Sequence, residues 1–210
     1  MKYESIEDLS VEQRLTLNKR IAEAMSKRDE FTTEADVRYF ETDAYLHELR
    51  RNPQGEDDYF DFDDGNGPVP AHKHPNGGGW VADTATVDET AYVGAEAQVF
   101  GNAEVSGNAK VSGNAEVFGN AGVSGNAEVF GHAWVFSNAW VYDNAKVFGD
   151  AKAYGYAQVF DDARVFDDSR VFGYAKVYDD AKVFGDAQVF GDAKVFVNAR
   201  VYGDADVSGR

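Results

Sequence analysis

Residues 115–132 have the sequence AEVFGNAGVSGNAEVFGH, which is three successive copies of a six-residue unit of the form Ala-x-Val-x-Gly-polar. The unit extends far beyond this stretch. Val recurs at every sixth position from Val81 to Val207, and 21 of these 22 positions are Val, with Ala153 as the exception. Because no residue is inserted or deleted along this series, the period predicts a repeat architecture.

The residue two positions before each Val is also nearly constant: it is Ala from Ala85 to Ala205, with Ser169 as the exception. Residues two apart in an extended segment point to the same side, so Ala and Val are expected to share an inward face. The Gly and the Asn or Asp that follow tolerate the left-handed dihedral angles of a tight corner. Very short strands joined by such corners are expected to wind into a coil, in which each strand pairs with its equivalent one turn away.

This pattern resembles the hexapeptide-repeat superfamily, whose left-handed parallel β-helix is known from trimeric acyltransferases. The resemblance covers residues 81–210 and implies a triangular coil of three units per turn. The left hand is taken from the resemblance, because parallel crossovers are otherwise right-handed. The expected fold is therefore mainly β, a left-handed parallel β-helix solenoid of about seven triangular coils preceded by an N-terminal helical hairpin.

The sequence before the repeat divides into two parts. Residues 1–52 are predicted to be helical, because a capping-box pattern and apolar residues at helical spacing occur in them. Residues 53–79 are rich in Gly, Pro and Asp and are expected to form an acidic linker, either a solvated tether or an acidic-aromatic motif that a partner grasps. The β-helix is then expected to span residues 80–210, with Trp80 covering the open end of the Val column.

Equivalent positions in successive coils are 18 residues apart, so the residues after Val form aromatic ladders on the edges of the coil. The ladders comprise Phe100, Phe118, Phe136, Tyr154, Phe172 and Phe190; Phe130, Phe148, Phe166, Phe184 and Tyr202; and Tyr142, Phe160, Tyr178 and Phe196. They are expected either to support strand pairing by stacking or to offer apolar edges for assembly. Trp134 and Trp140 join them as candidate binding residues.

The composition excludes several classes of function. A formal net charge of −17 argues against direct nucleic-acid binding, since phosphate contacts need surplus cations. The absence of Cys excludes disulfides, thiolate metal sites and a Cys nucleophile. No apolar run approaches the roughly 18 residues of a membrane span, and the first residues lack the apolar core of a signal peptide. A cytoplasmic protein without a membrane partner is expected.

The repeat contains one His, His132, which stands at a corner that is held by Asn or Asp in most units. Resemblance to acyltransferases implies a His general base and an acyl-carrier cofactor, and Trp134 and Trp140 are near His132 in sequence. However, no insertion protrudes from the repeat to form a cleft. His132 is therefore only a weak catalytic candidate, and no cofactor is expected.

Metal binding is weighed at two places. The carbonic anhydrases related to the resembled family bind zinc through three His, but here His72 and His74 lack a convincing third ligand. Hard carboxylate oxygens at the corners could hold divalent cations between coils, although Asp also suits a corner for its dihedral angles alone. These weak candidates are Asp161, Asp162, Asp179 and Asp180. No metal site is predicted.

Three functions remain open. The first is a non-enzymatic scaffold or protein-binding module that forms homo-oligomers and whose final coil is covered by another copy or a partner. The second is an acyl-coenzyme A-dependent acyltransferase or a degenerate relative. The third is an acidic inhibitor, from a phage or mobile element, that imitates nucleic acid.

Overall fold

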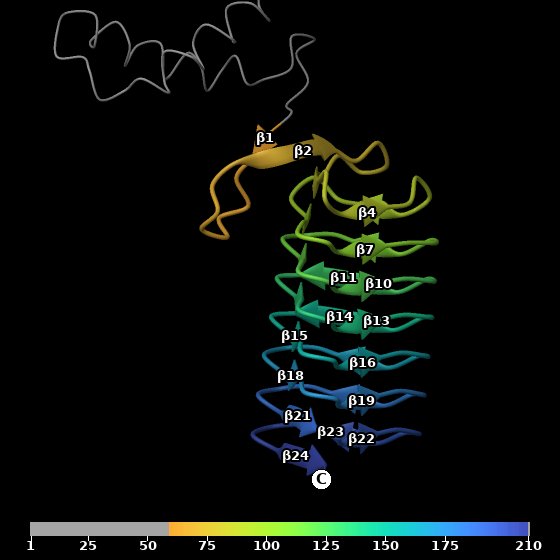
Figure 1. The fold of residues 1–210 in the computed structure, drawn as a ribbon. Coiled ribbons are helices and arrows are strands. Elements are labelled where there is room, and N and C mark those ends of the chain that lie inside the picture. Colours follow the sequence, from red (N-terminus) through yellow and green to blue (C-terminus); the bar gives the residue numbers. More distant parts are fainter. Residues whose placement is uncertain (1–58, 210) are drawn as a thin grey trace, which may run out of the picture. The chain divides into compact units, whose positions relative to one another are not determined.

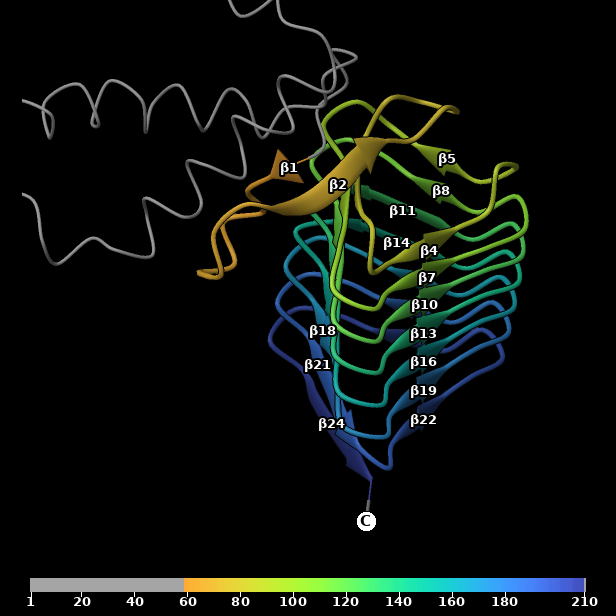
Figure 2. The ribbon, with the colours of Figure 1, turned by 45° about the horizontal axis from the view of Figure 1, so that its top comes forward.

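The computed structural model describes residues 59–209, and from Trp80 onward these residues form a column of stacked coils with three faces (Figure 1). Each face is a sheet whose strands lie one below another along the column (Figure 2). Neighbouring strands within a face are 18 residues apart in sequence, as in the pairs Val99–Val117 and Val117–Val135. The structure therefore confirms a mainly β, parallel solenoid of about seven turns.

The strands are short and follow one another around the column. Face 1 comprises β1 (Tyr59–Phe60), β2 (Val69–Lys73), β3 (Trp80–Ala82), β6 (Gln98–Val99), β9 (Glu116–Val117), β12 (Trp134–Val135), β15 (Lys152–Ala153), β18 (Arg170–Val171), β21 (Gln188–Gly191) and β24 (Asp206–Gly209). Face 2 comprises β4 (Thr86–Val87), β7 (Glu104–Val105), β10 (Gly122–Val123), β13 (Trp140–Val141), β16 (Gln158–Val159), β19 (Lys176–Val177) and β22 (Lys194–Val195). Face 3 comprises β5 (Tyr92–Val93), β8 (Lys110–Val111), β11 (Glu128–Gly131), β14 (Lys146–Gly149), β17 (Arg164–Val165), β20 (Lys182–Val183) and β23 (Arg200–Val201).

The Val and Ala side chains fill a single apolar shaft inside the three faces. Nearly all of them are completely buried from Ala91 to Val195, including the substituted position Ala153. Ser169 is equally buried, and its hydroxyl donates to the carbonyl oxygen of Phe166 at 2.7 Å. Each buried Val stabilises the fold by about 1.5 kcal/mol or more, so this shaft is the core of the unit.

The corners need a left-handed backbone because successive coils approach each other closely there. Gly131 has a φ of 79°, and a Cβ placed on it would lie 2.9 Å from the backbone nitrogen of Gly149. Asp replaces Gly at some of these corners, as at Asp161, where φ is 56°. Asp tolerates this region better than most residues, which explains why Asp can replace Gly at some corners of the repeat.

Residues 69–79 close the first coil rather than forming a solvated tether. Strand β2 pairs antiparallel with β3, which covers the edge of face 1. On face 3, Gly79 donates its backbone N–H to the carbonyl oxygen of Val93 at 2.9 Å. The side chain of His74 is buried, with Nε2 3.2 Å from the carbonyl oxygen of Asp88 next to face 2. The tether expectation is wrong for these residues, because their backbone groups complete the hydrogen bonding of the first coil.

Trp80 does not cover the end of the shaft, contrary to the sequence-based prediction. It precedes Val81 by one residue and so points outward from face 1, by the alternation of side chains along a strand. Its ring stacks on Phe60 with centroids 4.5 Å apart, and Nζ of Lys73 lies 4.4 Å from its centroid. Trp80 therefore anchors the segment that precedes the repeat to the outside of face 1.

The predicted helical hairpin, in residues 1–52, lies outside the residues that the structure describes. Within residues 59–209, no helix has the length and apolar character that crossing a bilayer demands.

Candidate functional site

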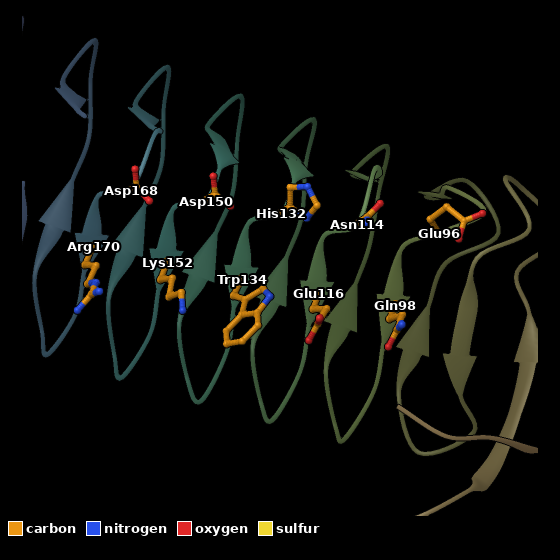
Figure 3. Close-up of a pocket in the computed structure, with 10 residues that line it drawn as sticks. All are labelled: Glu96, Gln98, Asn114, Glu116, His132, Trp134, Asp150, Lys152, Asp168 and Arg170. Carbon is orange, nitrogen blue, oxygen red and sulfur yellow. The ribbon is translucent and has the colours of Figure 1, made fainter. Parts of the chain in front are cut away.

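A polar groove of about 610 Å³ runs along the outside of face 1, crossing its strands (Figure 3). Two columns of side chains line it, and both follow the 18-residue spacing of the coils. The outward residues of β6, β9, β12, β15 and β18 are Gln98, Glu116, Trp134, Lys152 and Arg170. The corner residues that precede these strands are Glu96, Asn114, His132, Asp150 and Asp168. The groove is thus a direct product of the repeat.

The structure brings His132 and Trp134 together in this groove but places Trp140 on face 2. His132 is exposed at its corner, between Asn114 and Asp150 of the adjacent coils. No hydrogen bond to the His132 ring occurs within residues 59–209. A general base is normally oriented by a hydrogen bond on its second nitrogen, so the geometry offers His132 as a ligand-contacting side chain rather than as a prepared catalyst.

The charges in the groove are arranged around Trp134. Nζ of Lys152 lies 4.1 Å from the centroid of the Trp134 ring, a cation–π contact. Partial burial, reinforced by the negative charge of Asp63, raises the pKa of Glu116 above its usual range, while Lys152 opposes the shift. The groove can therefore hold a polar ligand by amide, carboxylate and cationic groups. Sequence reasoning missed Glu116 and Lys152, although the 18-residue spacing places both in line with Trp134.

The aromatic ladders are continuous stacks along the edges of the column. Phe118 and Phe136 are typical, with centroids 4.9 Å apart and planes 3° apart. The centroid distances between successive rings on the three edges range from 4.7 Å, for Phe130 and Phe148, to 5.4 Å, for Phe184 and Tyr202. Because each ring inside a ladder covers the faces of its neighbours, mainly the edges of these inner rings point to solvent. This geometry supports the stacking role of the ladders.

Phe62 extends the face 1 ladder from outside the repeat. In the first coil the ladder position holds the small residue Ala82, and the Phe62 ring stacks on Phe100 with centroids 4.7 Å apart. Phe62 is buried, and it clusters with Ala71, Ala82 and Phe100. Phe62 is thus bound by the solenoid of its own chain. The sequence contained one sign of this contact, because the ladder position of the first coil is Ala82, which has no ring to cover Phe100.

The acidic corners bond to backbone rather than gathering around a cation. Oδ2 of Asp161 accepts a hydrogen bond from the backbone N–H of Asp179 at 3.3 Å. Oδ2 of Asp179 accepts one from Val197 at 2.9 Å in the next coil. Asp162 and Asp180 line a smaller hollow of about 170 Å³ that also contains Arg164 and Lys182 on face 3. In the described part of the chain, no three His, Asp or Glu side chains are placed to share a metal ion.

The two His residues before the repeat contact different groups. Nδ1 of His72 is 2.9 Å from a carboxylate oxygen of Asp83, on the surface. The buried His74 bonds to backbone, as described for the first coil. The pair therefore provides no shared metal site.

Comparison with known proteins finds no family model, no curated protein and no solved structure that matches this chain.

Proposed function

We propose that the chain is a non-enzymatic β-helical scaffold that self-assembles and presents repeated surfaces to protein partners. The observation that carries this proposal is the unbroken register of the coils. All three faces keep the 18-residue spacing through the last strands, as in the pairs Val177–Val195 and Val183–Val201. Without an inserted loop in the repeat, the long groove on face 1 stays open to solvent. Enzymes normally enclose their reacting groups to exclude water.

We further infer that the chain is a remote member of the hexapeptide-repeat superfamily and that its coil is left-handed, as in that superfamily. Three six-residue units per turn and one sheet per unit support this inference. The aromatic ladders depart from the small residues usual in the family at this position. Their stacking explains how the column accepts large side chains there.

Homo-oligomers are proposed to form through the last coils. Large apolar side chains are exposed there, with Phe196 47% and Tyr202 62% accessible. Light scattering of the purified full chain should give a mass of at least two copies, and Phe196→Asp with Tyr202→Asp should give one copy. Tyr174→Asp, at an exposed position nearer the middle of the column, is the matched control and should leave the mass unchanged. A monomeric wild-type protein would refute self-assembly.

An acyltransferase is the second candidate, because the groove places His132 beside carboxylate, amide and aromatic side chains. Incubation with acetyl-coenzyme A and a panel of amines and hydroxyl acceptors tests it. Turnover that disappears in His132→Ala would favour the enzyme over the scaffold. Absence of turnover, with no binding of the cofactor, would favour the scaffold.

An acidic decoy for a nucleic-acid-binding protein is the third candidate, and the net charge of −17 supports it. Cations interrupt the acidic surface, as where Arg164 and Lys182 line the same hollow as Asp162 and Asp180. A captured partner that DNA displaces from this chain would favour the decoy.

A further inference from the structure

One tryptophan lies on face 2 over a glycine. Trp140 of β13 is in register with Gly122 of β10 in the preceding coil. A Cβ placed on Gly122 would lie only 2.5 Å from Cε3 and Cζ3 of the Trp140 ring. Gly122 is also the only Gly among the outward strand positions from Trp80 to Asp206. The missing side chain thus makes the space in which the indole lies against the strand above it.

Trp140 differs from the other two tryptophans in what covers its ring. Phe60 and Lys73 cover Trp80, and Lys152 lies over Trp134. Among residues 59–209, no aromatic ring or cation is placed on Trp140, and 40% of its surface is accessible. One face of the indole packs on the sheet at Gly122, so the exposed part includes its other, flat side.

The side chains around this ring can form hydrogen bonds and carry little charge. Asn138 stands two residues before Trp140 in the same coil and ends a run of side-chain amides, in which Asn102 donates to Asn120 and Asn120 donates to Asn138. The next position in that column is Tyr156, and Nδ2 of Asn138 donates no side-chain hydrogen bond within the described coils. Gln158 is in register below Trp140.

One acidic group completes the surroundings. Glu104 is in register with Gly122 in the coil above, and it is exposed. The platform, defined as Trp140 with Gly122, Asn138, Glu104 and Gln158, therefore combines a flat apolar surface with amide donors and acceptors and a single carboxylate.

We propose that this platform binds a pyranose unit of a neutral carbohydrate. The C–H groups on one side of a pyranose ring form a flat apolar surface that packs on an indole, and its hydroxyls both donate and accept hydrogen bonds. Asn138 donates to a hydroxyl oxygen, Gln158 can do either, and Glu104 accepts from a hydroxyl. Indole packing with a few placed polar groups is the usual composition of a small-ligand site.

Two other occupants fit the platform less well. An anionic polymer would meet the Glu104 carboxylate in a chain of net charge −17. A protein partner normally covers about 800 Å² per side and uses several apolar anchors, whereas this platform has one ring surrounded by polar groups. A second copy of the chain is a protein partner too, so the single ring of the platform argues against it in the same way. The carbohydrate proposal does not depend on the self-assembly proposed for the scaffold.

The test is calorimetric titration of the full chain with cellohexaose, maltohexaose and chitohexaose, three neutral oligosaccharides of different linkage or substitution. At least one is expected to bind, with the Trp emission shifted on binding. Trp140→Ala should weaken that affinity by about tenfold or more, and Trp140→Tyr should lose less. Tyr92→Ala is the matched control, because Tyr92 is an outward aromatic residue of similar exposure (38%) on face 3, and it should stay within about twofold of wild type.

Circular dichroism melts of all variants establish that the column is still folded. Gly122→Ser serves as a second variant because it displaces the indole without removing it, and it should also weaken binding. The proposal is overturned if none of the three hexasaccharides binds at millimolar concentration. It is equally overturned if Tyr92→Ala weakens binding as much as Trp140→Ala, or if Trp140→Ala dissociates an oligomer without any effect on carbohydrate binding.

Discussion

Ala153 is the one position in the shaft where Val is replaced, and restoring Val there tests how the shaft packs. Ala153 is completely buried, and so are its register neighbours Val135 and Val171. The coils on either side keep the same register as the rest of the column, so the backbone at Ala153 is that of a Val position. At about 0.8 kcal/mol per buried carbon, two added methyl groups favour folding by about 1.6 kcal/mol. We expect Ala153→Val to stabilise the protein by about 1–1.5 kcal/mol after the loss of rotamer freedom.

Two matched variants bracket this value. Val171→Ala removes the same two groups from the adjacent coil and leaves a cavity, so it should cost about 2–3 kcal/mol. Ala151→Val adds the groups at the inward Ala position of the same strand segment, where the column holds no Val. Overpacking there should cost about 1–3 kcal/mol.

Urea unfolding followed by circular dichroism measures all three, and the slope of the transition reports whether the cooperative unit has changed. The reasoning fails if Ala153→Val destabilises as much as Ala151→Val. It also fails if Val171→Ala costs less than about 1 kcal/mol, because the shaft would then not be closely packed.

Three further predictions concern the corners, the groove and the cap. Gly131→Ala should cost about 1–3 kcal/mol, more than Gly203→Ala, because both have positive φ but only Gly131 faces backbone at 2.9 Å; equal costs in urea unfolding would contradict the contact between coils. The raised pKa of Glu116 means that the fold disfavours its carboxylate, so its contribution to stability falls as the pH rises through and above the ordinary Glu value. Glu116→Gln should remove this part of the pH dependence of the melting temperature between about pH 4 and 7, and a pH profile equal to that of the wild type would contradict this role of Glu116. Phe62→Ala should cost about 3 kcal/mol or more and should speed hydrogen exchange in the first coil, while exchange rates equal to wild type would show that the stack on Phe100 is dispensable.

The repeat could be predicted from sequence because it follows from the alternation of side chains along an extended strand. Val and Ala two residues apart share a face, and an uninterrupted period keeps that face inward in every coil. The cap could not be predicted in this way. Residues 69–79 carry no period, and their strand contains Pro70 and His72, so composition indicated a linker.

Only part of the groove on face 1 could be predicted from the sequence. His132 and Trp134 are two residues apart in one coil, so the sequence already places them close together, but the position of Lys152 over the indole depends on side-chain conformation. The field of Asp63 at Glu116 depends on how a segment outside the repeat packs on the column. The sequence contained one sign of the exposed Trp140 ring, which is that Gly122 stands at an outward strand position where other units have a larger residue. This sign can be interpreted only when the register that pairs Gly122 with Trp140 is known.

The shared register of the coils makes the column modular in length. Any eighteen consecutive residues inside the repeat supply one strand to every face, so duplicating or deleting such a block would leave all remaining coils correctly paired. The same equivalence permits a folding error in which the chain skips a turn and extrudes it as a loop. The closing segment opposes that error only at the first turn, where Asn76 bonds to the carbonyl oxygen of Ala91 and so marks where winding starts.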